Sequence, residues 1–156
     1  MAKRSKKTTL IRKRGRKVGQ PPGTLVHVGE QHSENASLTL VRYNQEQYSE
    51  QILPRVADLD RNAHPEQMLW CQVKGVHDAT VVQEIGELFQ LHPLVMEDIL
   101  NTDQRPKLEI HEHYLYIVLK AIEFDAETSA ARTEQISLVL GDGFLLSLQE
   151  RSNDLF

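Results

Sequence analysis

The sequence predicts an α/β fold in which one mixed sheet is flanked by helices. Helix-like and strand-like segments alternate over residues 24–100, and a long apolar strand follows at 113–124. Two further strands, at 136–140 and 144–148, are joined by Gly-Asp-Gly, a strong hairpin signal. Interleaved helices followed by a β-meander are typical of a mixed sheet that carries helices. The 156 residues are enough for one ordinary domain with a real core.

Charge divides the chain into a basic tail and an acidic body. Residues 1–17 hold nine of the 18 Lys and Arg residues and no acid, whereas all 22 Asp and Glu residues come later. With no apolar period, residues 1–20 are predicted to be a disordered tail, and residues 21–156 the folded domain. Such a tail either seeks phosphates of nucleic acid or anionic lipid, or is only a solubilising extension.

The first part of the body is expected to contain two strands and a helix. Short strands are predicted at 24–28 and 38–43, where apolar and β-branched residues lie between polar loops. Asn44 then has the spacing of a helix cap, with a glutamine three residues later as its reciprocal partner. Tyr48 and Ile52, at i and i+4, would form the apolar edge of that helix.

A strand and an amphipathic helix are expected next. Residues 55–66 are predicted to be irregular or a short helical turn, and residues 68–73 a buried strand with Trp70 in the core. Asp78 is the expected N-cap of the helix that follows. Its apolar face recurs at i, i+3, i+4 and i+7 and consists of Val81, Val82, Ile85, Leu88 and Phe89.

The segment LHPLVMEDILNTDQRPK, residues 91–107, is the most informative part of the chain. It predicts a short helix from Pro93 to about Leu100, because proline suits the first helical turn. Glu97 and Asp98 then fall in the last turn, the unfavourable end of the helix dipole, at a cost of roughly 0.3–1 kcal/mol per charge. Asp103 adds a third acid. Carboxylates at this end require a cation, either a side chain or a metal ion.

Two explanations of these acids stay open at this point. Arg105 and Lys107 follow closely and could neutralise them as ordinary surface pairs. Alternatively, the acids bind a metal ion at a working site, where local rules are often broken.

The last third of the chain predicts a sheet centre. The strand at 113–124 carries apolar residues on both faces, so both faces are expected to be covered. Glu109, His111 and His113 alternate just before it, and two histidines at i, i+2 can hold a transition metal. Histidines at a sheet edge are more often solvated, so no metal site is expected there.

Several classes of protein lack support in the composition. Cys71 is the single cysteine, so an internal disulfide is impossible and a reducing setting is expected. No secretion signal is visible, and no run approaches the roughly 18 apolar residues of a membrane span. The chain shows no glycine-rich phosphate loop, no cysteine pair at zinc spacing and no nucleophile elbow, so an enzyme is not expected.

The motifs of residues 91–107 carry a family resemblance. Their His-Pro-Leu, Glu-Asp-Ile and Gln-Arg-Pro-Lys resemble, at this spacing, the signature of the N-terminal cytoplasmic domain of CorA-type magnesium/cobalt channels. Three further segments resemble parts of that domain in the same order: PPGTLVHVGE at 21–30, GVHDATVVQEIGELF at 75–89 and EQISLVLGDGFLLSLQE at 134–150. The resemblance therefore runs from about Pro21 to Phe156.

The resemblance implies a fold, a site and an assembly. The fold is an α/β sandwich around a mixed sheet of about seven strands. Asp98 matches an aspartate that faces a neighbouring subunit and helps to hold Mg²⁺, or Co²⁺ or another divalent cation, between subunits. Glu97 is the second expected metal-binding carboxylate. Since bound Mg²⁺ removes the repulsion between carboxylates, it would lock the subunits of a homopentamer and so regulate transport of magnesium or cobalt.

Other family parts are missing from the sequence. The family continues into a stalk helix and two transmembrane helices with a Gly-Met-Asn motif, so we expect this chain to be the soluble part alone, placed on the cytoplasmic side of the cell membrane by those helices. The same domain of a zinc transporter is an alternative. A nucleic-acid-binding module using the basic tail is another, disfavoured by the acidic body. A metal-dependent hydrolase would need a convergent His/Asp cluster, which the sequence lacks.

Overall fold

The computed structural model describes residues 21–29, 36–126 and 129–151. The basic tail expected over residues 1–20 lies outside them. The described elements are β1 (Ser37–Tyr43), β2 (Tyr48–Leu53), the 3-10 turn η1 (Val56–Asp58), β3 (Met68–Lys74), α1 (Ala79–Leu88), α2 (Pro93–Leu100), β4 (Lys107–Ile110), β5 (Tyr114–Asp125), β6 (Ala130–Gly141) and β7 (Phe144–Gln149). Neither described helix has the length and apolar character that a membrane crossing requires.

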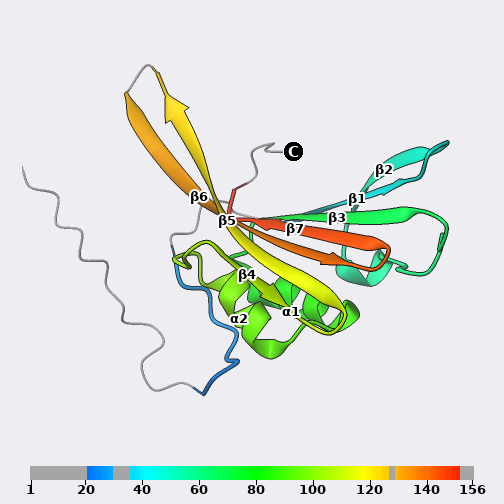
Figure 1. Cartoon of the computed structure of the whole chain (residues 1–156), viewed down its shortest axis with the longest axis horizontal. Coiled ribbons are helices and arrows are strands. Elements are labelled where there is room, and N and C mark those ends of the chain that lie inside the picture. Colours follow the sequence, from blue (N-terminus) through cyan, green and yellow to red (C-terminus); the bar gives the residue numbers. More distant parts are fainter. Residues whose placement is uncertain (1–20, 30–35, 127–128, 152–156) are drawn as a thin grey trace, which may run out of the picture.

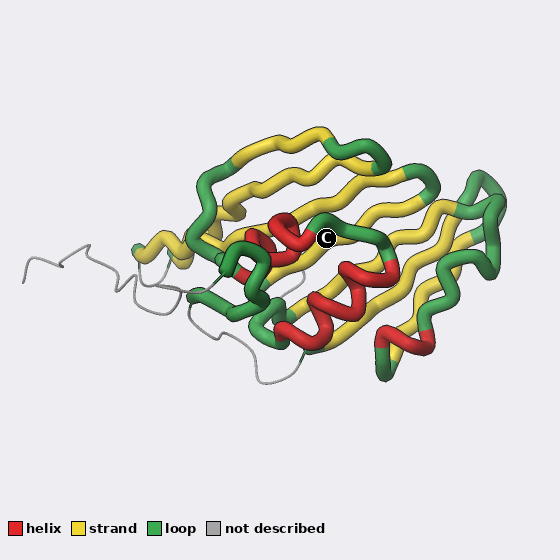
Figure 2. Tube along the Cα trace, turned by 90° about the horizontal axis from the view of Figure 1, so that it is seen from below, coloured by secondary structure: helices red, strands yellow, loops and turns green. Residues whose placement is uncertain are grey.

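The described strands form one seven-stranded mixed sheet, which confirms the predicted fold class. Their spatial order is β2-β1-β3-β7-β6-β5-β4. β3 and β7 run parallel, whereas the other neighbouring strands are antiparallel. α1 and α2 connect β3 to β4 and both lie over the same face of the sheet (Figures 1 and 2).

The core lies between the two helices and that face. From the sheet it takes Leu40, Cys71, Leu146, Val139 and Tyr116, whose positions face one another across paired strands, and from the helices Val82, Ile85, Phe89, Val95, Ile99 and Leu100. Burial raises the pKa of the Cys71 thiol to about 12, so this cysteine is an inert core residue.

The opposite face of the sheet is apolar but open in the described chain. Trp70, expected in the core, lies half-buried on this face and donates a hydrogen bond from Nε1 to Ser147 Oγ at 2.9 Å. Register places several exposed side chains on the same face: Ile52, Leu108, Ile110, Leu119 and Leu140. Ile52 and Ile110 are 78% and 80% exposed. Apolar patches of this kind mark interaction surfaces.

Two local predictions are wrong. The helix expected after Asn44 is strand β2, in register with β1. Asn44 does cap a local structure, but it is a turn: its Oδ1 accepts hydrogen bonds from the N–H groups of Glu46 and Gln47 at 2.9 and 2.8 Å. Asparagine makes the same bonds in turns and at helix starts, so strand pairing decides the outcome. The strand expected at 24–28 is reduced to one bridge between Val28 and Asn101.

The outer part of β5 is also less covered than predicted. Ile122 and Phe124 are 73% and 66% exposed. β4 pairs with β5 only up to Val118, and β7 pairs with β6 only from Ile136, so beyond those points the described β5 and β6 pair with each other alone. The result is a two-stranded ribbon that extends past the sheet (Figure 1).

Residues 55–66 contain η1, as expected.

The contact between α1 and α2 gives a first testable prediction. A Cβ atom added to Gly86 of α1 would lie only 1.9 Å from Met96 Sδ of α2. We therefore expect Gly86→Ala to destabilise the chain by about 1–3 kcal/mol, although alanine normally favours a helix. Urea denaturation measures the loss. The double variant Gly86→Ala, Met96→Ala should lose less stability than the sum of the losses of the two single variants. Strictly additive losses would contradict the contact.

Candidate functional site

A tight helix ending places α2 directly after α1. Gln90 adopts a left-handed conformation, with φ of 56°. The N–H of Leu91 then donates to the carbonyl of Gly86 at 2.8 Å, and the N–H of Gln90 to that of Glu87 at 3.3 Å. This pair of bonds is a Schellman motif, which satisfies the last carbonyls of α1 and reverses the chain. The predicted cap of α1 by Asp78 is confirmed.

α2 begins and ends where the sequence predicts. Pro93 occupies the first turn, and His92 is the N-cap, its Nδ1 accepting a hydrogen bond from the N–H of Leu94 at 3.2 Å. The N–H of His92 donates to the Tyr114 hydroxyl at 2.9 Å, which fixes the start of the helix against β5. The buried face of α2 consists of Val95, Met96, Ile99 and Leu100.

Asp98, at the other end of α2, is held by side chains from the segment that follows the helix. Its Oδ2 lies 2.5 Å from Lys107 Nζ, and its Oδ1 accepts a hydrogen bond of 2.5 Å from Gln104 Nε2. Lys107 Nζ also lies 2.7 Å from Glu109 Oε1. In the described structure the cation required at this helix end is therefore a lysine side chain, as in the ion-pair explanation of the acids.

The two carboxylates stabilise the charged lysine that lies beside both of them. Burial alone would lower the pKa of Lys107, but its hydrogen bonds with Asp98 and Glu109 give a net rise. The hydrogen bond from Lys107 lowers the pKa of Glu109. The Lys107–Glu109 pair therefore stabilises the fold at a pH above the ordinary pKa of glutamate. This contribution is lost as the pH falls through the lowered pKa of Glu109. The Lys107 ammonium also lies 5.4 Å from the Tyr116 ring centroid, a favourable cation–π distance.

A buried glutamine supports the same end of α2 from the sheet. Gln135, on β6, is 2% exposed. Its Nε2 donates to the carbonyls of Asn101 and Asp98 at 3.1 and 3.4 Å. Its Oε1 accepts from the N–H of Gln104 at 3.0 Å and from Lys120 Nζ at 3.2 Å. These bonds satisfy helix-end carbonyls and hold the loop that positions Gln104 beside Asp98.

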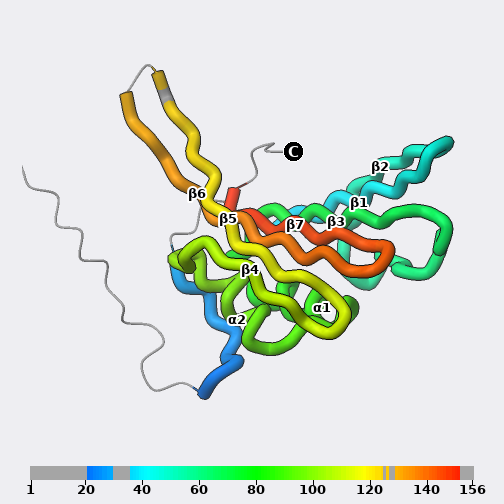
Figure 3. Tube along the Cα trace, viewed as in Figure 1, coloured from blue at the N-terminus to red at the C-terminus, as the bar shows by residue number. Residues whose placement is uncertain are grey.

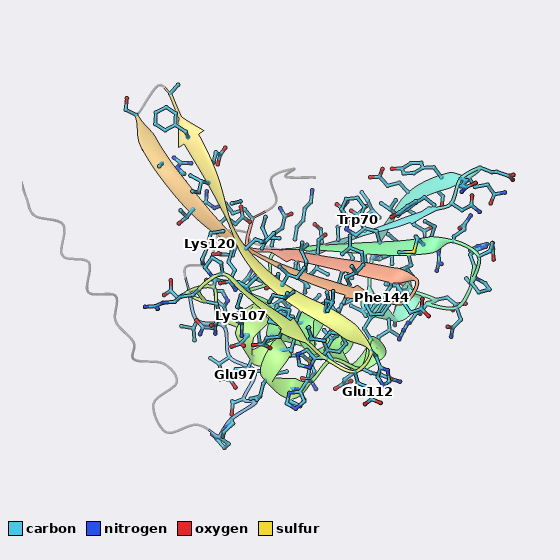
Figure 4. The ribbon with its side chains drawn as sticks, viewed as in Figure 1. Trp70, Glu97, Lys107, Glu112, Lys120 and Phe144 are labelled. Atoms are coloured by element: carbon cyan, nitrogen blue, oxygen red, sulfur yellow. The ribbon has the colours of Figure 1, made fainter. Side chains whose placement is uncertain are left out.

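Glu97 serves a different part of the molecule. Its Oε2 accepts a hydrogen bond of 2.7 Å from the N–H of Gly23, which lies in the segment 21–29 that runs beside α2 (Figure 3). The bridge of Val28 with Asn101 ties the same segment to the end of the helix. Glu97 therefore bonds the segment 21–29, whereas Asp98 bonds Lys107. Glu97 and Lys107 are labelled in Figure 4.

The oxygen atoms around Asp98 suit part of a magnesium site. Within the described residues, no three His, Cys, Asp or Glu side chains converge as a metal site would require. Mg²⁺ is commonly held by one or two carboxylates while it keeps several waters, so Asp98 and its neighbours fit an incomplete site for a hydrated ion. His111 and His113 lie beside different acids, with Nε2 3.4 Å from Glu109 Oε2 and 3.8 Å from Glu112 Oε2, respectively.

Sequence reasoning missed the polar residues that hold Asp98. No sequence pattern points to Gln104 or Gln135, and Lys107 looks like an ordinary neutralising charge. Gln135 does not stand out in the sequence, because it directly follows Arg132, Thr133 and Glu134 in the same strand. Its role follows from the crossing of β6 behind the end of α2, which no local pattern encodes.

Comparison with known proteins gives consistent matches. Residues 65–156 match the model of the family described as CorA-like Mg²⁺ transporter protein. The chain is 39% identical over 140 residues to the cobalt/magnesium transport protein CorA of Thermotoga maritima, covering 90% of this chain and 40% of that protein. It is 31% identical over 78 residues to the putative metal ion transporter YfjQ of Bacillus subtilis, covering 50% of this chain and 23% of that protein.

Solved structures share the fold at lower sequence identity. The full-length CmaX protein superposes with a TM-score of 0.59 at 16% identity, covering 78% of this chain and 37% of that one. The soluble domain of CorA from Methanocaldococcus jannaschii gives a TM-score of 0.52 at 13% identity, covering 74% of this chain and 41% of that one. The chain thus spans about 40% or less of the curated relatives that it matches.

Proposed function

Because the chain belongs to the CorA-like Mg²⁺ transporter family, we propose that it is the cytoplasmic regulatory domain of a magnesium or cobalt channel, where it senses Mg²⁺ between subunits and gates transport. The observation that carries the proposal is Asp98. It is a partly exposed carboxylate at the unfavourable end of α2, held in place by Gln104 and Lys107.

The proposed mechanism is electrostatic. In the assembly, Asp98 faces a carboxylate of a neighbouring subunit. Two such charges repel by about 4 kcal/mol at a separation near 4 Å and an effective dielectric near 20. A hydrated Mg²⁺ between them reverses the sign and holds the subunits together, and its loss frees them to move. Glu97 adds to the negative potential of this region while it anchors the segment 21–29.

The open face of the sheet supports a role within a larger assembly. Exposed apolar residues such as Ile110 and Leu140 are poorly suited to water. We propose that further segments of the channel cover this face and complete the sandwich, and that those segments form the homopentamer and its membrane-spanning part. The domain itself then regulates transport and catalyses no reaction.

Limited proteolysis of the intact channel that carries this domain tests the function. Protease resistance should rise as MgCl₂ is raised through the millimolar range, because the bound ion locks the subunits. NaCl at matched ionic strength should give no such rise, since screening alone does not bridge carboxylates. Cleavage that is independent of the Mg²⁺ concentration would contradict magnesium sensing.

A further inference from the structure

We propose that Lys107 is a built-in competitor of the divalent cation at Asp98, and that Glu109 is the second carboxylate of the position for which they compete. This inference rests on the proposed function. It concerns what sets the Mg²⁺ concentration to which the site responds.

The ammonium group of Lys107 lies between two carboxylates. Lys107 Nζ lies 2.5 Å from Asp98 Oδ2 and 2.7 Å from Glu109 Oε1. The two acids come from different elements, Asp98 from the last turn of α2 and Glu109 from β4. A cation that takes the place of the ammonium group therefore has carboxylate oxygens on both sides. The Glu97 carboxylate instead accepts a hydrogen bond from the N–H of Gly23.

The charges favour exchange of the lysine for a divalent ion. One ammonium group beside two carboxylates leaves a net charge of −1, whereas Mg²⁺ neutralises the pair. Hydrated Mg²⁺ is commonly held by one or two carboxylates, and this position offers two. The side chains of Lys107, Asp98 and Glu109 are 27%, 24% and 40% exposed, so water and ions reach the group. A long, flexible lysine on the edge strand β4 is able to swing into solvent when displaced.

Competition of this kind lowers the affinity of the site for the divalent ion. Each divalent ion that binds must displace the lysine from Asp98, so Lys107 raises the concentration at which the ion binds. Removing the lysine charge while keeping the length of its stem should therefore tighten binding. Removing Asp98 as well should abolish the gain.

Calorimetric titration of the 156-residue chain with MgCl₂ tests the competition. We expect millimolar affinity for the wild-type chain, because the neighbouring subunit's carboxylate is absent. Lys107→Met should bind at least about fivefold more tightly, the lower end of common coupling effects. Lys107→Arg keeps a cation beside the carboxylates and should show no gain in affinity over wild type. Lys74→Met, a lysine on β3, removes the same charge elsewhere and should also leave the affinity unchanged.

The outcomes separate this inference from the proposed function. Equal affinities for the wild-type and Lys107→Met chains would overturn it, as would a gain that survives in the Lys107→Met, Asp98→Asn double variant. Thermal melting without Mg²⁺ shows whether each variant folds, and Lys107→Gln replaces the methionine variant if that one does not. If Lys107→Met binds more tightly but the intact channel ignores Mg²⁺, the inference stands and the sensing function fails. If Asp98→Asn shifts the channel's response but Lys107→Met leaves binding unchanged, the reverse holds.

Discussion

Replacing Leu100 with alanine is expected to destabilise the domain by about 2–5 kcal/mol, the range for a large aliphatic side chain removed from a rigid core. Leu100 is fully buried at the last position of α2. It also joins the segment 21–29 to the helix, because its carbonyl accepts a hydrogen bond of 2.9 Å from the N–H of Val28. The loss is measured as a lower urea midpoint at an unchanged slope.

Leu94→Ala is the matched control for that change. Leu94 lies on the same helix and has the same side chain, but it is 47% exposed. Its loss should stay within about 0.5 kcal/mol, as for most surface substitutions. Similar losses for the two variants would contradict the burial of the α2 face. Because Leu100 is two residues from Asp98, Leu100→Ala should also loosen the carboxylate's contacts.

The helices that carry the site are readable from the sequence because their signals are local. An aspartate cap and an apolar period predict α1, and proline at the first turn predicts α2. Even the conflict between Asp98 and the helix dipole is visible, since it depends only on position within one helix. The Gly141–Gly143 turn signal is local in the same way, and the predicted hairpin is formed by β6 and β7.

Features that depend on distant partners could not be predicted. Trp70 has the pattern of a core residue, but which face of the sheet receives the helices is decided by the path of the chain after β3. Strand β2 has helix-like spacing, and pairing with β1 overrides it. The hydrogen bonds of Gln135 with Asp98, Asn101 and Gln104 join residues more than 30 positions apart in sequence. For Asp98 the sequence predicts a cation and offers Arg105, Lys107 or a metal ion, and the fold places Lys107 there.

Asp98→Asn is expected to shift the response of the intact channel to Mg²⁺ by roughly 5–150-fold in concentration, the usual range of allosteric couplings. Asparagine keeps the shape of the side chain, and its Oδ1 can still accept the hydrogen bond from Gln104. The substitution therefore removes mainly one negative charge from the proposed site between subunits. Protease protection measured against MgCl₂ concentration gives the midpoint, which should move to higher concentration.

Asp103→Asn is the control for Asp98→Asn, because it removes the same charge from an exposed position just after the helix. If only the general negative potential attracts Mg²⁺, both substitutions should shift the midpoint by similar amounts. If Asp98 contacts the hydrated ion, its substitution should have much the larger effect, since an exposed charge that does not contact the ion is weakened by solvent and salt. An Asp98→Asn midpoint equal to that of wild type would remove this residue from the mechanism. The domain would then have to sense Mg²⁺ elsewhere.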